Sequence, residues 1–406
     1  MWISEPSDGD LAICVPQDFA DHRIRVVEIS SHLVCVVIMR RLVTVLFVGL
    51  WGWGCGDNGI ASVDAPGRLP FAPAPHAPLP RVFPHAGVVL SNVQLVTLTF
   101  DDYVLRPQVE TFGDLIVKSP WYMDVGLEYG VSAGTQVGKG TLGRAPEVIT
   151  RAYIEDGINQ LIADRLVPGP QLAGNQLLYM VYVPSGVARD AKVDGHYQMI
   201  TADGIRVPIA IVIDDGSDLA ITTSIAAHQL INAVTNPYDP PNDGYYADPP
   251  KTDPWSFTNG GVADLCQGED PVVEDGFTLP RVYSSVAARS GRFPCKPVVD
   301  NDAWTDVTAE PHTIQVVPKG GSVTFTLTGW STQELPDWEL RTHVADSSKL
   351  DEAAIRPELS HNRINNNTSV QLTLHVPDTA VSGSRGGVYV LSGANVRPWL
   401  VGFIVQ

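Results

Sequence analysis

The sequence predicts two folded parts, an α+β domain followed by an all-β, immunoglobulin-like sandwich. Strand-like and helix-like stretches alternate between residues 93 and 234, as they do in α/β and α+β domains. From about residue 300 onward, short stretches of alternating apolar residues lie between turn sequences, a pattern typical of β-sandwiches. The chain has 406 residues, of which 44% are apolar, so it can form two cores and is too hydrophobic for a disordered chain.

The charge balance excludes one class of partner. The chain carries 45 acidic and 27 basic side chains, a formal net charge of −18. Proteins that wrap nucleic acid need clustered Lys and Arg to meet the phosphates, so we expect no nucleic-acid partner. The longest uncharged apolar stretch is shorter than the roughly 18 residues of a membrane-spanning helix, so we expect no such helix.

Residues 39–55, MRRLVTVLFVGLWGWGC, resemble a bacterial lipoprotein signal peptide. Two arginines precede 12 apolar residues, a stretch too short to span a bilayer but suited to a signal peptide. Cleavage before Cys55 would leave a cysteine for lipidation, although Gly52 stands where such signals usually carry Leu. We therefore expect an exported lipoprotein, periplasmic or on the cell surface, whose membrane contact is the lipid anchor at Cys55.

The segments on either side of the signal call for separate interpretations. Residues 1–38 match no signal, and our hypothesis is that translation starts at Met39; a genuine N-terminal extension is the alternative. Residues 56–86 are rich in Pro and Ala, which predicts an extended, semi-rigid tether. The two folded parts would then occupy residues 87–299 and 300–406.

Cys266 and Cys295 are the two cysteines that follow Cys55. An even pair in an exported protein predicts a disulfide, which would close a loop of about 30 residues. The alternative, a metal bound by two thiolates, needs further ligands, and none stands at zinc-site spacing.

The first folded part has recognisable elements in chain order. Apolar, β-branched stretches predict strands over residues 93–100, 177–183 and 207–213. Apolar residues at helical spacing predict helices over residues 110–118, 146–166 and 218–234, the last with Asp218 as N-cap and with Pro237 as its stop. Residues 240–258 predict a loop, and the chain looks irregular up to Cys295.

The second folded part is predicted from alternation alone, because no cysteine pair marks it. Its expected strands are residues 312–317, 322–327, 338–344, 369–376, 387–391 and 399–405.

Residues 227–238, AHQLINAVTNPY, hold the strongest candidate site. His228 and Asn232 are four residues apart and share one face of the predicted helix. Zinc hydrolases place two ligands at this spacing, with Glu directly after the first as general base. Here Gln229 stands at the general-base position and cannot accept a proton at neutral pH, and Asn232 is a poor zinc ligand. The spacing fits a zinc hydrolase, but the residue types do not.

Several blocks together resemble the secreted exordium-like proteins of bacteria, fungi and plants. These metallopeptidase-like proteins carry a segment S-H-E-x-x-E-A-x-T-D-P and a later block G-E-x-G-D-L-C. The resemblance covers residues 93–266, in the blocks 112–131 (FGDLIVKSPWYMDVGLEYGV), 178–186 (LYMVYVPSG), 207–213 (VPIAIVI), 227–238 and 260–266 (GGVADLC). It implies a zincin-like α/β domain.

The resemblance also implies which residues are retained. His228, Asp264 and Cys266 match the family, so His228 and Asp264 are the vestigial metal ligands. Four positions that are acidic in the family are neutral here: Gln229, Asn232, Asn236 and Gly261. The resemblance therefore implies a pseudoenzyme with no catalytic residue and no cofactor, zinc being the single candidate, which binds or scaffolds an unidentified protein or glycan.

Two rival functions remain at this point. An active zinc peptidase would use atypical ligands, with His196, His228 and Asp264 close together in space. A carbohydrate-binding surface protein would show an exposed aromatic strip on the sandwich. Structural roles are the simpler alternatives, His228 as a hydrogen-bonded helix residue and Asp264 as a brace beside Cys266.

Three further patterns are weaker. Residues 134–143 (GTQVGKGTLG) look like a phosphate loop but have three residues between the glycines and Gly140 after Lys139, which favours a flexible loop. Acidic residues in two loops could gather calcium, although solvated acids are the simpler interpretation: Asp214, Asp215, Asp239, Asp243 and Asp248. Trp255, Tyr245 and Tyr246 fit either ligand binding or core packing.

Overall fold

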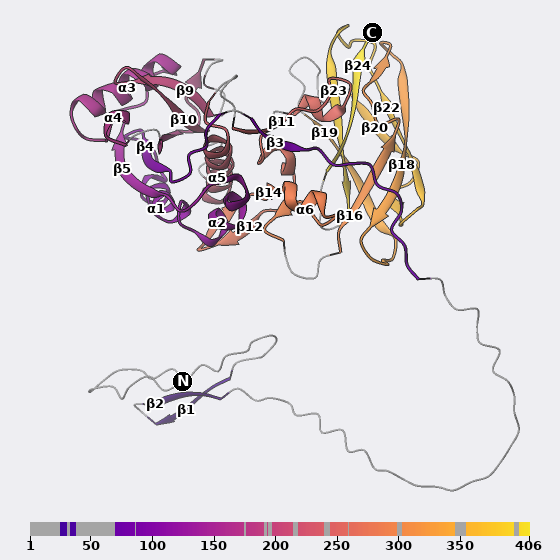
Figure 1. Cartoon of the computed structure of the whole chain (residues 1–406), viewed down its shortest axis with the longest axis horizontal. Helices are drawn as coiled ribbons and strands as arrows, with labels where there is room; N and C mark the ends of the chain where they lie inside the picture. The colour runs from indigo at the N-terminus through magenta and orange to yellow at the C-terminus, as the bar shows by residue number, and fades with distance from the viewer. Residues whose placement is uncertain are drawn as a thin grey trace, which may run out of the picture. The chain divides into compact units, whose positions relative to one another are not determined.

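A computed structural model describes residues 25–30, 33–37, 70–85, 87–173, 176–190, 193, 197–213, 218–238, 244–258, 260–298, 303–345, 355–393 and 398–406. The chain divides into two compact units, Met1–Arg68 and Leu69–Gln406. In the first unit, β1 (Arg25–Ser30) and β2 (Leu33–Val37) form an antiparallel pair. The predicted signal peptide, with Cys55, lies outside the described residues. The second unit holds both α/β and all-β parts (Figure 1).

A five-stranded mixed sheet forms the centre of the α/β part, in the order β5-β4-β7-β10-β9. Four strands are parallel neighbours, and the edge strand β9 runs antiparallel to β10. Every residue of β7 is buried, as expected for a parallel strand covered on both faces. The strands are β4 (Gln94–Thr99), β5 (Thr135–Thr141), β7 (Leu177–Val183), β9 (Tyr197–Ala202) and β10 (Ile205–Ile213).

Helices cover both faces of this sheet (Figure 1). Alternate strand residues such as Met180 and Tyr182 join one core with α1, α2 and α5, whereas Tyr179 and Val181 join another with α3. No helix of the described residues has the length and apolar character to cross a membrane. The helices are α1 (Arg106–Ile116), α2 (Pro120–Gly126), α3 (Arg151–Ala163), α4 (Pro170–Ala173), α5 (Leu219–Thr235) and α6 (Ser285–Arg289).

Helix α5 positions the candidate site. Asp218 caps it, as predicted, because its Oδ1 accepts a hydrogen bond of 2.8 Å from Ala220 N. Nearly all of its C-terminal half is buried, because the helix lies between β10 and β13 (Phe277–Leu279). The helix ends at Asn236, just before Pro237.

Two sheets packed on a shared core form the all-β part. One has the order β16-β18-β22-β20 and the other β17-β24-β23-β19-β21. Inward residues such as Phe325, Leu372 and Phe403 are fully buried, whereas Thr324 and Thr373 hydrogen-bond each other across the outer face. The strands are β16 (Thr305–Glu310), β17 (Gln315–Val317), β18 (Ser322–Ser331), β19 (Trp338–Ala345), β20 (Arg356–Leu359), β21 (Arg363–Ile364), β22 (Ser369–His375), β23 (Arg385–Ser392) and β24 (Trp399–Val405).

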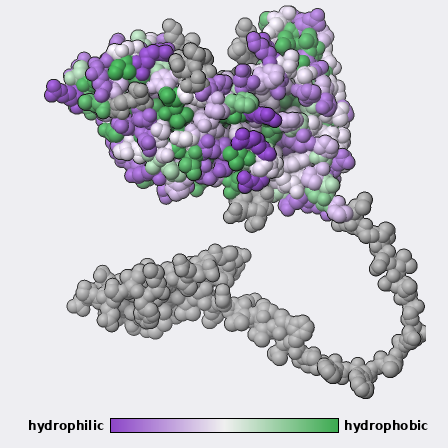
Figure 2. Space-filling view, viewed as in Figure 1, coloured by the Kyte–Doolittle hydropathy of each residue, from purple (hydrophilic) through white to green (hydrophobic). Residues whose placement is uncertain are grey.

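All six stretches predicted as strands here contain a strand, and β16, β20 and β21 were not predicted. They escape prediction because polar residues interrupt their apolar pattern, for example Asp306 in β16 and Glu358 in β20. On the face shown in Figure 2, hydrophobic residues form small patches among hydrophilic ones, which fits two parts that bury most of their apolar side chains inside.

The connection that the sequence predicts as irregular contains short, ordered elements. The disulfide between Cys266 and Cys295, 29 residues apart, is confirmed and joins η4 (Asp264–Cys266) to β15 (Cys295–Lys296). The connection also contains β11 (Tyr245–Ala247), η3 (Pro254–Phe257), β12 (Val272–Glu274) and β14 (Val282–Tyr283).

Helix α3 begins later than predicted, because Thr150 is its N-cap. Three short elements lie earlier in the chain than the connection: η1 (Leu127–Tyr129), β6 (Val148–Ile149) and β8 (Ala188–Arg189).

The glycine-rich stretch 134–143 is neither a flexible loop nor a phosphate loop. Most of it is strand β5, which pairs in parallel with β4. Gly138 and Gly140 allow close packing, because a Cβ at Gly138 would lie 3.0 Å from Pro168 Cδ. The glycines were misread because this packing against a distant loop has no local sequence signal.

The Pro-rich stretch also differs from the prediction over residues 70–85, which are part of the fold rather than a free tether. Its β3 (Val82–Pro84) pairs antiparallel with β11. Ala74 and Val82 are buried in the core that contains α5. Proline restricts the chain to extended conformations, and these fit a groove as well as they fit a spacer.

Replacing both disulfide cysteines, as Cys266→Ala with Cys295→Ala, is expected to lower the free energy of unfolding by about 3 to 4 kcal/mol, because the loop is no longer closed. Urea unfolding followed by fluorescence measures the change. Reductant should lower the wild-type midpoint to a similar extent and leave the variant unchanged. A variant as stable as the oxidised wild type would contradict the expectation.

Candidate functional site

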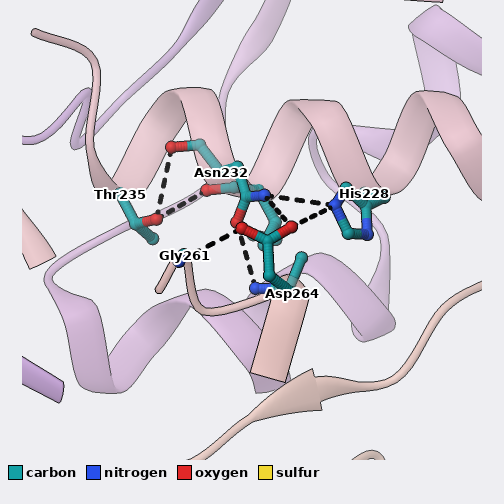
Figure 3. A network of polar contacts seen from close by, with 7 residues as sticks. His228, Asn232, Thr235, Gly261 and Asp264 are labelled. Atoms are coloured by element: carbon teal, nitrogen blue, oxygen red, sulfur yellow. Dashed lines mark hydrogen bonds and ion pairs between the residues drawn. The ribbon is translucent and has the colours of Figure 1, made fainter. Parts of the chain in front are cut away.

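The predicted site residues of α5 meet the η4 turn that precedes the disulfide (Figure 3). His228 and Asn232, one helical turn apart, both point at Asp264. The side chains of His228 and Asp264 are 19% and 11% exposed, and Asn232 is buried. The structure therefore brings together the His228 and Asp264 that the family resemblance singled out.

Asp264 is the centre of a hydrogen-bond network. His228 Nε2 lies 2.7 Å from Asp264 Oδ1, and Asn232 Nδ2 donates to the same oxygen over 3.1 Å. The backbone N–H of Gly261 donates to Oδ2 over 3.1 Å. Because a carboxylate only accepts hydrogen bonds, His228 Nε2 carries the proton that faces it. This leaves Nδ1 as the ring nitrogen that the network does not use.

The amide of Asn232 is held in one orientation. Its Oδ1 accepts a hydrogen bond of 3.0 Å from Ala263 N, so its Nδ2 faces Asp264. A carboxylate in this place would put two negative oxygens about 3 Å apart, which is unfavourable without a cation between them. The amide thus supplies a donor where a metal site needs an acceptor.

Gly261 occupies a position that is sterically closed. A Cβ there would lie 2.6 Å from Asp264 Oδ2 and 2.7 Å from Asn232 Oδ1. Real Cβ atoms do not approach other atoms so closely, so a side chain at this position is incompatible with the network. The glycine at position 261 and the direct contact between Asn232 and Asp264 therefore depend on each other.

The surroundings of Asp264 stabilise its ionised, anionic form. Burial raises the pKa of Asp264, but the hydrogen bond and charge of His228, with donors from Asn232 and Gly261, outweigh it and hold the pKa below its usual range. Tyr389 on β23 also lies within reach of this charge. Burial, together with the negative charge of Asp264, raises the pKa of Tyr389 to about 12. Tyr389 and Leu400 of the all-β part pack against the core that contains α5 and Leu265, so the site lies near the junction of the two parts.

Of the other predicted site residues, the structure describes Gln229, Asn236 and Asp248. Gln229 is buried, and none of the bonds that join the described residues His228, Asn232 and Asp264 involves it. Asn236 braces the chain beyond α5, its Oδ1 accepting from Gly244 N over 2.7 Å. His196 lies outside the described residues, as do Asp214, Asp215, Asp239 and Asp243 of the calcium alternative. Asp248 is exposed.

A metal ion does not fit the residues of this site. Within the described ranges, no group of three or more His, Cys, Asp or Glu side chains could hold a metal. His228 and Asp264 provide two acceptors at most, and Asn232 turns N–H toward the place where a cation would sit. What the arrangement does is to fix an imidazole against a buried carboxylate.

The positions of the tryptophans in the all-β part test the alternative function, carbohydrate binding, which requires exposed aromatic side chains. In the part of the chain that the structure describes, they are buried: Trp304, Trp330, Trp338 and Trp399. Trp255 is also buried and packs edge-on against Trp399, with ring centroids 6.4 Å apart. The exposed aromatic strip expected for glycan binding is thus not formed by these side chains.

Sequence reasoning missed Tyr389 and the backbone groups of Gly261 and Ala263. Tyr389 follows His228 by more than a hundred residues, and no local pattern joins them. The glycine was noted as a lost acid, but its role as a close-packed donor depends on the position of Asp264.

Comparisons with known proteins leave the family open. No family model matches the chain, and no curated protein matches it. Among solved structures, a family 123 glycoside hydrolase from Clostridium perfringens aligns at 12% identity and a TM-score of 0.18, over 22% of each chain. The yeast GGA1_GAE domain aligns at 7% identity and a TM-score of 0.15, over 27% of this chain and 96% of that one. The chain thus spans about a fifth of the hydrolase, and neither likeness carries an argument.

Replacing the central carboxylate, as Asp264→Asn, is expected to lower the free energy of unfolding by about 1 to 3 kcal/mol at neutral pH. Because folding lowers the pKa of Asp264, its contribution is complete above the unfolded value of about 3.9 and is lost as the pH falls through the lower folded value. In a series from pH 6 to pH 2, the urea midpoints of wild type and variant should therefore draw closer as the pH falls below about 3.9. Asp248→Asn, at an exposed aspartate, is the matched control. A constant difference across this range would contradict the assignment.

Proposed function

We propose that this chain is an exported, lipid-anchored protein of the periplasm or cell surface whose metallopeptidase-like α/β part binds rather than cleaves. One observation carries the proposal: the amide of Asn232 stands in the third position of a ligand triangle. Its Nδ2 lies 3.2 Å from His228 Nε2 and 3.1 Å from Asp264 Oδ1, and those two atoms are 2.7 Å apart.

These separations resemble those of ligands around a metal. Ligands of a tetrahedral zinc ion, with bonds of about 2.0 Å, lie roughly 3.3 Å from one another. The triangle is therefore close to the size of one face of a zinc site, but two of its corners, His228 Nε2 and Asn232 Nδ2, are N–H donors to Asp264. This supports a site that keeps the shape of the family's metal centre while its own hydrogen bonds replace the metal.

The fold is compatible with the zincin-like part of the proposal. Helix α5, which carries His228 and Asn232, follows β10, the last of the parallel strands of the five-stranded sheet. The two packed sheets of the all-β part are consistent with an immunoglobulin-like sandwich, and the disulfide supports export, because disulfides persist in oxidising compartments. Binding through the junction beside Tyr389 would use a rigid surface made from both parts.

Metal binding by the purified full chain tests the loss of the catalytic centre. We expect zinc titration calorimetry to show no saturable site in wild type or in His228→Ala, because the site lacks a third acceptor. Asn232→Asp keeps the side-chain shape and exchanges the donor for an acceptor, so we expect it to gain a zinc site. Adding His228→Ala to Asn232→Asp should remove that gain. Stoichiometric zinc in wild type that disappears in His228→Ala would overturn the proposal and favour an active peptidase.

Lipid labelling tests the anchor. When the full gene is expressed in a bacterium fed a labelled fatty acid, we expect the label in the wild-type chain and in the membrane fraction. Cys55→Ser should lose both, because the lipid is attached through the cysteine sulfur. Ser62→Ala, a substitution nearby in the sequence, is the control and should keep both. Equal labelling of Cys55→Ser would contradict the lipoprotein assignment.

A further inference from the structure

Residues 70–81, PFAPAPHAPLPR, cross the all-β part as an extended segment without regular secondary structure, drawn in indigo in Figure 1. We call these residues the strap. Five of its twelve residues are proline, so few backbone N–H groups are available for hydrogen bonds. Prolines 73, 75 and 78 are exposed, while Ala74 and Pro80 are buried. The strap thus lies on the all-β part with one side against it and the other toward solvent.

The backbone of the strap is bound by side chains from distant parts of the chain. Asn366 makes two hydrogen bonds of 2.9 Å, from its Nδ2 to Ala72 O and from Ala74 N to its Oδ1. Ala77 N donates to Thr308 Oγ1 over 3.2 Å. Tyr283 Oη donates to Pro80 O over 2.6 Å. Such contacts depend on an extended backbone and not on the identity of the strap's side chains.

One side chain of the strap enters a cage of aromatic rings. The ring of His76 lies 5.8, 4.8 and 5.4 Å, centroid to centroid, from the rings of Trp304, Trp330 and Trp399. Its Nε2 lies 3.3 Å from Oδ2 of Asp306, within ion-pair distance but without hydrogen-bond geometry. The side chain of Asp306 is fully buried, and its Oδ1 accepts a hydrogen bond of 2.8 Å from Val307 N. The indole Nε1 of Trp304 is buried with no hydrogen-bond partner among the described residues.

The chemistry of the cage favours a cation. A carboxylate withdrawn from water is costly unless a positive group pairs with it. Indole faces also attract cations, and aromatic cages are a recurring way of binding alkylated ammonium groups. Proline-rich ligands, in turn, are recognised by aromatic-lined grooves that hydrogen-bond their carbonyls. The site that holds the strap combines an aromatic cage suited to a cation with side chains that hydrogen-bond an extended, proline-rich backbone.

We propose that Trp304, Trp330, Trp399 and Asp306, with Asn366 and Thr308, form a recognition site for an extended proline-rich peptide that carries a cationic side chain. Residues 70–81 are its intramolecular ligand, and the imidazole of His76 occupies the place of the cationic side chain beside Asp306. We assign this occupant because residues 70–81 themselves make every contact with the site described above. The site is separate from the His228 network and does not depend on the proposed loss of peptidase activity.

Cation recognition is tested by emptying the cage in the full chain. His76→Gly leaves a space of imidazole size beside Asp306, so imidazole at pH 6 should bind there and change the tryptophan fluorescence in a saturable way. Pyrazole, a neutral ring of the same shape, should bind at least about tenfold more weakly, because it cannot pair with the carboxylate. In His76→Gly with Asp306→Asn the two probes should become equivalent. Equal binding of both probes, or no saturable binding, in folded His76→Gly would overturn the proposal.

Peptide recognition is tested by releasing the strap. Ala74→Pro removes the N–H that binds Asn366, and His76→Asp places a second carboxylate against Asp306, so the double variant should free the site. A fluorescently labelled peptide of residues 70–81 should then bind with a rise in anisotropy. Wild type should bind it at least about tenfold more weakly, because the tethered strap competes at high effective concentration.

The same peptide with His76→Ala is the matched control and should bind the double variant more weakly by a similar factor. A folded double variant that does not bind the wild-type peptide would overturn the proposal. A wild-type chain that runs as a dimer in gel filtration, and as a monomer once the strap is released, would assign the strap to a second copy and overturn the intramolecular assignment.

Discussion

The cost of withdrawing a carboxylate from water governs both sites of this protein. Asp264 and Asp306 are each paired with an imidazole, His228 in one case and His76 in the other. Around Asp264 the remaining donors come from an amide and a backbone N–H, and around Asp306 the imidazole is enclosed by indole rings. Each carboxylate therefore contacts a segment that is distant in the sequence. Asp264 contacts helix α5 through His228, and Asp306 contacts the strap through His76.

The first of these pairs belongs to a closed network of hydrogen bonds around Asp264. Once Asn232 donates to Asp264 and Ala263 N holds the amide in place, the network satisfies its own hydrogen bonds. Gly261 completes it, because any side chain there would collide with Asp264 and Asn232. The nearby disulfide fixes the η4 turn, so Asp264 stays in reach of α5.

The second pair, His76 and Asp306, shows that part of the Pro-rich segment is packed on the fold. Composition alone describes a spacer between a lipid anchor and a folded domain. In the fold, its C-terminal half is a bound ligand, held through its backbone by Asn366 and Thr308 and through His76 by the cage.

Much of the secondary structure could be predicted from the sequence, because alternation in β18 and β22, the unbroken apolar run of β7 and the Asp218 cap are local patterns. The disulfide and the spacing of His228 and Asn232 were equally visible. The tertiary structure alone decided that Gly138 lies in a strand, that Gly261 is a closed position and that His76 enters a cage. The physical reason is the same in each case: at least one partner atom comes from a residue about thirty or more positions away, and only packing brings it within reach.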